Sequence, residues 1–175
     1  MHHAQLIREY LDGPFLVRDA VEGMTPEQLH GRPIPGQWST LELVCHLADA
    51  EMLYAERMKR VIVEDGPAFA PAEPDACVAR LACQHRNLEI ELRLIELTRC
   101  QMAHILRHLE PDDFQRCGIH SADGRLTLEE LLSRVTDHVP HHVRFIGEKR
   151  QAFKDAAWKT QPPWGTSASG MAMKS

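Results

Sequence analysis

The segment from residue 127 to residue 146, TLEELLSRVTDHVPHHVRFI, has the pattern of a long amphipathic helix. Its apolar side chains recur every three or four positions, which is the period of a helix with one buried face. Thr127 and Glu130 match a capping box, in which each side chain bonds the backbone N–H of the other residue. We therefore expect a helix that begins here and runs to about Trp158.

The predicted inward face of this helix contains two histidines. It consists of Leu128, Leu131, Leu132, Val135, His138, Val139, His142, Phe145 and Ile146. Residues four positions apart lie on the same side of a helix, so His138 and His142 should be neighbours in the core. His141 lies about 100° around the helix from His142 and should face a flank or solvent. Pro140 lacks the N–H that would bond the Thr136 carbonyl, so we expect a kink between the two inward histidines.

A second helix has an equally clear start in WSTLELVCHLADAE, residues 38 to 51. Ser39 and Glu42 form another capping box, and the helix should run to about Val63. His46 lies in the middle of its apolar face. Asp49 follows about one turn later, where it could orient an imidazole or act as a base.

Two more helices complete the predicted architecture. We expect them over residues 3 to 22, with a bend or interruption at Gly13 and Pro14, and over residues 75 to 109. No segment shows the alternation of a strand, which predicts an all-α fold, an antiparallel four-helix bundle. We expect one domain over residues 1 to 158 and a loosely ordered tail from 159 to 175.

Composition excludes several function classes. The 175 residues carry a net charge of -5 and no block of Lys and Arg, which argues against a nucleic-acid partner. No run approaches the roughly 20 apolar residues of a membrane span. The polar N-terminus and five cysteines without C-x-x-C spacing favour a cytoplasmic protein with reduced thiols.

Three of the eleven histidines, His46, His138 and His142, should point into one core. One divalent cation satisfies a nitrogen of all three, which predicts a metal site with an open position for water or substrate. Core histidines that bond their own neighbours are the other interpretation, since chance gives about 0.7 H-x-x-x-H pairs at this composition. The second such pair, His104 and His108, lies off the apolar face of its helix, and we do not expect it to bind metal.

Two motifs extend this interpretation, W-S-x-x-E-x-x-x-H-L at residues 38 to 47 and H-x-x-H-H at residues 138 to 142. In these motifs, and in helix order over residues 1 to 155, the chain resembles the DinB-like, or YfiT-like, superfamily of metal-dependent enzymes. The resemblance implies an up-down-down-up bundle, often a homodimer. It also implies zinc, nickel or iron bound by His46, His138 and His142.

The expected function is that of a metal-dependent enzyme that activates water or a thiol against a small electrophilic substrate. Characterised members of the superfamily include thiol S-transferases, so the resemblance implies a low-molecular-weight thiol cosubstrate as one option. A hydrolase would need the same metal, open position and pocket. A non-catalytic metal-binding protein or a dimeric helical interaction protein is the alternative.

Overall fold

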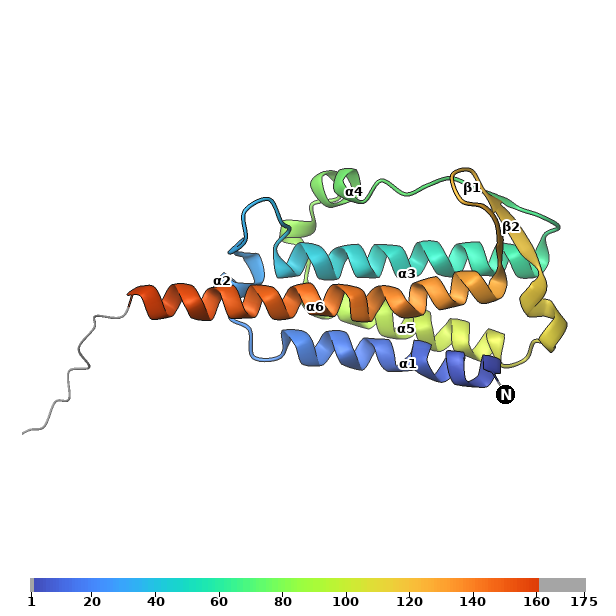
Figure 1. Ribbon diagram of the computed structural model, residues 1–175, viewed down its shortest axis with the longest axis horizontal. Helices are drawn as coiled ribbons and strands as arrows, with labels where there is room; N and C mark the ends of the chain where they lie inside the picture. The colour runs from blue at the N-terminus through green and yellow to red at the C-terminus, as the bar shows by residue number, and fades with distance from the viewer. Residues whose placement is uncertain (1, 161–175) are drawn as a thin grey trace, which may run out of the picture.

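The computed structural model describes residues 2–160. Four long helices lie side by side along the long axis of the molecule (Figure 1): α1 (His2–Val21), α3 (Thr40–Val63), α5 (Leu88–Leu106) and α6 (Leu128–Thr160). In Figure 1, α1 and α6 run in one direction, whereas α3 and α5 run in the other. The predicted four-helix bundle and its up-down-down-up order are therefore confirmed.

Short elements connect the long helices. They are α2 (Pro26–His30), α4 (Pro74–Arg80) and two 3-10 turns, η1 (Cys83–His85) and η2 (Pro111–Gln115). Both predicted capping boxes are present: Ser39 and Glu42 begin α3, and Thr127 and Glu130 bond each other's backbone N–H before α6. The sequence alone predicts these two helix starts because each capping box involves residues only three positions apart.

A small sheet contradicts the expectation that the chain has no strands. Its strands are β1 (Ala68–Phe69), β2 (Cys117–His120) and β3 (Gly124–Thr127), in the order β1-β2-β3. β1 is parallel to β2, and β2 is antiparallel to β3. Strands of two to four residues are too short to show an alternating pattern in the sequence.

The predicted helix over residues 75–109 is also wrong, because the chain turns within it. Ala82 has a φ of 52°, in the left-handed region, and separates α4 from the helix α5. The side chain of Asn87 accepts a hydrogen bond from the backbone N–H of Ile90 and caps α5. Leu81, which directly follows α4, is 51% exposed.

α1, by contrast, continues through Gly13 and Pro14 without the expected interruption. Pro14 cannot donate to the carbonyl of Tyr10, but a guanidinium nitrogen of Arg99 donates to that carbonyl instead, at 2.6 Å. A Cβ at Gly13 would lie 1.9 Å from the same nitrogen. The Gly-Pro pair therefore provides space and an acceptor for an arginine of another helix.

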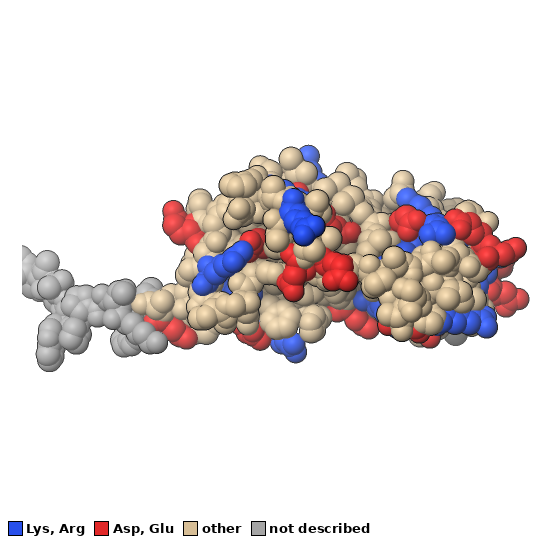
Figure 2. Space-filling view, turned by 90° about the horizontal axis from the view of Figure 1, so that it is seen from above, with Lys and Arg blue, Asp and Glu red and all other residues tan. Residues whose placement is uncertain are grey.

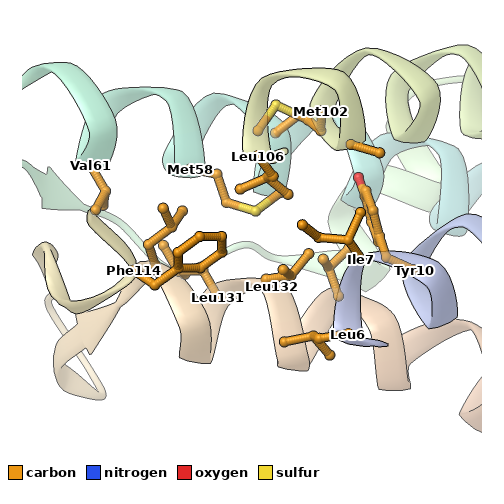
Figure 3. Close-up of a cluster of buried hydrophobic side chains, with 14 of the residues drawn as sticks. Leu6, Ile7, Tyr10, Met58, Val61, Met102, Leu106, Phe114, Leu131 and Leu132 are labelled. Carbon is orange, nitrogen blue, oxygen red and sulfur yellow. The ribbon is translucent and has the colours of Figure 1, made fainter. Parts of the chain in front are cut away.

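The bundle core is formed by side chains of all four long helices. Figure 3 shows part of one buried cluster, to which Phe114 of η2 also belongs: Leu6, Ile7, Tyr10, Met58, Val61, Met102, Leu106, Leu131 and Leu132. A second buried cluster lies around Val17, Leu47, Ile95, Val139 and Ile146. At the centre, Glu51 and Arg99 form an ion pair in which both side chains are 0% exposed.

The surface carries both signs of charge. On the face with α4 and β1, Lys and Arg side chains lie close to Asp and Glu side chains (Figure 2). Over the described residues, none of the helices combines the length and the apolar character needed to cross a membrane. Of the tail expected from residue 159 onward, residues 161–175 lie outside the described part of the chain.

Candidate metal centre

The structure brings His46, His138 and His142 together. His46 is on α3, and the other two lie one turn apart on α6, as the helical periodicity predicted. The Nε2 atom of His138 lies 3.2 Å from that of His46 and 3.0 Å from that of His142. All three side chains are half-buried, and one nitrogen of each lies within 4.8 Å of the others.

The surroundings favour the neutral form of these imidazoles. Burial, followed by the neighbouring histidines, lowers the pKa of His138 to about 3. Burial likewise lowers the pKa of His142 to about 4, and that of His46 below its usual value. Neutral imidazole is the form that binds a metal ion, so the cluster is ready to bind one at neutral pH.

In this arrangement, three neutral imidazoles cannot provide hydrogen-bond partners for all of one another's ring nitrogens. At best, His46 and His142 both donate to Nε2 of His138, which leaves a proton on its Nδ1 atom. Nδ1 of His138 and Nδ1 of His142 are buried, and neither has a hydrogen-bond partner among residues 2–160. Zinc with nitrogen ligands at about 2.0–2.1 Å would place two tetrahedral ligands about 3.3 Å apart, close to the observed separations. The donor set therefore fits a divalent metal held by three Nε2 atoms.

The remaining histidines of the two H-x-x-x-H regions lie elsewhere. His141 is exposed and packs against Phe145, with ring centroids 5.1 Å apart. His104 and His108 are exposed near the end of α5, where Nδ1 of His108 bonds the His104 carbonyl at 2.7 Å. Pro140 lies within the continuous helix α6 and does not prevent His138 and His142 from converging.

Asp49 has a different partner from the one that we expected. Its two carboxylate oxygens accept hydrogen bonds of 2.9 and 3.0 Å from Arg86, whereas no histidine bonds it among the described residues. Arg86 also pairs with the buried carboxylate of Glu91. This arginine lies in the turn before α5, inside the segment predicted as helix, so sequence reasoning missed it.

Two other residues of this region, Glu42 and Cys45, have structural roles. The Glu42 carboxylate accepts from the Ser39 N–H in the capping box and pairs with Arg32 at 2.5 Å. Cys45 is fully buried, and its thiol donates to the Cys83 carbonyl at 3.5 Å. Burial raises the pKa of the Cys45 thiol, which makes it a poor nucleophile.

A cavity of about 540 Å³, here called the main groove, borders the histidine cluster. His46 and His138 form part of its wall. The rest of the lining includes apolar residues, Ala50, Leu53, Pro71, Ala72 and Pro74, and the polar or aromatic residues Asp49, Tyr54, Arg57, His120 and Asp123. A second pocket of about 330 Å³ borders His142 and contains Trp38, Phe145 and Lys149.

Sequence reasoning missed Arg57 and His120 as groove residues. His120 belongs to β2, and its Nδ1 accepts from the backbone N–H groups of Ala122 and Asp123 at 3.3 and 3.2 Å. Its position depends on the sheet, which the sequence did not predict. Arg57 lies 11 positions after His46 on α3, a spacing that returns to the same helix face and could have identified it.

Comparisons with known proteins identify the family of this chain. The profile of the DinB superfamily matches residues 15–146. A protein of Oceanobacillus iheyensis named "Putative metal-dependent hydrolase" is 30% identical over 140 residues, which cover 80% of this chain and 81% of that protein. One of Geobacillus thermodenitrificans with the same name is 32% identical over 140 residues, or 79% of this chain and 78% of that protein.

A solved structure is similar over most of its length. It is that of YfiT from Bacillus subtilis, described as "a probable metal-dependent hydrolase with an unusual four-helix bundle topology". The two chains are 27% identical, the similarity covers 87% of each, and the TM-score is 0.82. The four-helix architecture is therefore shared with this relative.

Proposed function

The chain belongs to the DinB superfamily, and from this membership and its histidine cluster we propose that it is a metal-dependent enzyme acting on a small electrophilic substrate. His46, His138 and His142 hold the metal, a divalent ion such as zinc, nickel or iron. The observation that carries the proposal is the approach of three neutral imidazoles through their Nε2 atoms, at 3.0 and 3.2 Å. Their donor set accepts several such metals, and availability decides among them.

A divalent metal held by three imidazoles supplies Lewis acidity at an open position, which generates a nucleophile from water or a thiol near neutral pH. The main groove lies beside the proposed ligands, because His46 and His138 are part of its wall. Its apolar lining would hold the body of a substrate and limit the access of bulk water. A groove beside the metal ligands supports an enzyme more than it supports a purely structural metal site.

Asp49 is the acid–base residue that we propose within the groove. Its carboxylate borders the same cavity as His46, and the paired hydrogen bonds from Arg86 fix its orientation. A carboxylate held in this way can accept a proton on a remaining lone pair. Arg86 acts through Asp49 and is therefore a positioning residue.

Both hydrolysis and thiol transfer are compatible with this arrangement. The names of the relatives favour water as the nucleophile. A low-molecular-weight thiol cosubstrate would use the same open position and groove. We also propose a cytoplasmic location, supported by five free cysteines, since disulfides are rare in reducing compartments.

We further propose a homodimer that uses α1 and α5. Large apolar side chains are exposed on both helices, namely Phe15 and Leu16 on α1 and Ile90 and Leu97 on α5. α1 also packs against α5, so the two helices can contribute to one self-complementary surface. Light scattering should give twice the chain mass of 19.9 kDa, and a monomer mass at micromolar concentrations would contradict the dimer.

Elemental analysis of the purified protein tests the metal site. We expect close to one divalent transition ion per chain, lost in His46→Ala and His138→Ala but kept in His104→Ala and His141→Ala. Full metal content in His46→Ala would refute the assignment. The loaded protein is then tested against a panel of electrophiles with water or added thiols. Activity should disappear with chelation and return with metal, and Asp49→Asn should lower activity without loss of metal.

A further inference from the structure

Arg57 is a buried cation without an anion. It is 6% exposed, and none of the carboxylates in residues 2–160 forms an ion pair with it. One of its nitrogens donates to the Ala70 carbonyl at 2.5 Å. A guanidinium has five N–H donors, so this single bond leaves most of its hydrogen-bonding capacity unused.

Aromatic rings hold the guanidinium in place. Its central carbon lies 5.6 Å from the centre of the Tyr54 ring and 5.8 Å from that of Phe69. Such contacts stabilise a cation but do not neutralise it. Arg57 and Tyr54 both line the main groove, so the positive charge borders a cavity of about 540 Å³.

The carboxylates in the groove wall already have their own arginines. Asp49 pairs with Arg86 at 2.9 Å, and Asp123 pairs with Arg134 at 2.5 Å. The hydrogen bond from Arg134 lowers the pKa of Asp123, and the charge of Arg57 adds a smaller effect in the same direction. Both acids of the groove wall are therefore paired with other arginines, and neither forms an ion pair with Arg57.

Comparison with Arg99 shows what a structural arginine looks like in this protein. Arg99 is 0% exposed, pairs with Glu51 and also donates to the carbonyls of Tyr10 and Val135. Its charge is fully compensated within the fold. Burying an uncompensated charge is costly, so a buried arginine without such partners indicates a site that an anion completes.

We propose that Arg57 binds a carboxylate of the substrate, so that the main groove selects small organic carboxylates with an apolar body. The planar fork of a guanidinium matches a carboxylate through two parallel hydrogen bonds. Leu53, Pro71, Ala72 and Pro74 line the groove and provide apolar contacts for the rest of the molecule. This inference names the substrate class of the proposed enzyme and therefore rests on the proposed function.

Spacing along α3 places the carboxylate away from the reacting group. His46, Ala50, Leu53 and Arg57 all line the groove, and 11 residues separate His46 from Arg57, a rise of about 16 Å along the helix. Side chains on a helix lean toward its N-terminus, which brings the guanidinium back toward His46. The substrate should therefore carry its carboxylate several bonds from the electrophilic atom.

Isothermal titration calorimetry with two probes tests the inference. The probes are 4-phenylbutanoate and its neutral amide, 4-phenylbutanamide, which differ in charge but little in shape. We expect the protein as purified to bind the carboxylate about tenfold or more tightly than the amide, as a charge-assisted pair predicts. Equal affinity for the two probes would overturn the inference.

Variants show where the preference arises. Arg57→Gln should remove the preference for the carboxylate probe over the amide. Arg57→Lys should keep part of this preference because the positive charge remains. Arg60→Gln is the matched control: Arg60 also stacks on Phe69 and donates to a carbonyl of the same segment, at Ala68, but it pairs with Glu64 and does not line the groove. A preference that survives in Arg57→Gln, or that Arg60→Gln removes, would refute the role of Arg57.

A carboxylate could also bind the metal, and His138→Ala separates the two cases. If Arg57 holds the anion, the preference persists in His138→Ala. If the preference is lost there but kept in Arg57→Gln, the anion lies on the metal and the inference is wrong. Metal content, measured in parallel, should be unchanged in Arg57→Gln. Absence of metal in every sample would refute the proposed function, whereas the probe affinities would still decide whether Arg57 binds anions.

Discussion

The guanidinium of Arg99 donates a 2.6 Å hydrogen bond to the backbone carbonyl of Tyr10, an acceptor that Pro14 leaves without a helical N–H partner. The same arginine donates to Glu51 at 2.5 and 2.9 Å, and the Tyr10 hydroxyl donates to Glu51 at 3.3 Å. A proline in α1 and an ion pair between α3 and α5 thus belong to one buried network. Because Tyr10, Glu51 and Arg99 are all buried, each depends on the others for its hydrogen bonds.

Gly13→Ala should therefore destabilise the fold by about 3 kcal/mol or more, since breaking a buried ion pair costs that much. The new Cβ would lie 1.9 Å from a guanidinium nitrogen that is fully buried and cannot move into solvent. Urea denaturation measures the effect. Gly147→Ala is the control: a Cβ added to this glycine of α6 would meet no atom within 4 Å, so alanine should be neutral or slightly stabilising. Similar free energies of unfolding for both variants would contradict the network.

Removal of the metal should lower the melting temperature without unfolding the protein at 25 °C. The proposed ligands lie on α3 and α6, which are remote in sequence, so a bound metal would cross-link the bundle. An ion that binds only the folded state stabilises it by mass action. Calorimetry before and after chelation measures the shift. An unchanged melting temperature would indicate histidines that bind no metal.

The metal-free protein should lose stability as the pH falls below about 6.5, the usual histidine pKa. The pKa values of His138 and His142 in the folded protein are about 3 and 4. Between about pH 6.5 and these values the unfolded chain binds protons that the folded cluster does not, so the free energy of unfolding decreases. Above pH 6.5 both states are neutral at these positions and the effect vanishes.

Urea midpoints at several pH values between 8 and 4.5 measure this dependence. A double variant, His138→Gln with His142→Gln, removes both titrating groups and should show a shallower decrease. Contributions from carboxylates are common to both proteins and cancel in the comparison. Equal slopes for the two proteins would show that the histidines keep ordinary pKa values in the fold.

The sequence predicted the parts of the fold that depend on neighbouring residues. The starts of α3 and α6 follow from capping boxes, whose partners are three positions apart. His138 and His142 share a face because they are four positions apart on one helix. The predicted helix over residues 75–109 did not take account of the helix cap at Asn87, and it therefore joined α4 and α5 into a single helix.

The tertiary structure decided which distant groups meet. His46 contacts His138 although 92 positions separate them in the sequence. The helical periodicity of each segment could show only that each histidine faces the core. Three further features likewise required the packed chain: the partner of Asp49, the sheet that carries His120, and the lack of an ion pair between Arg57 and any described carboxylate. The physical reason is that caps and helix faces follow from local backbone geometry. Ion pairing, burial and the convergence of ligands follow from contacts between segments that the sequence keeps far apart.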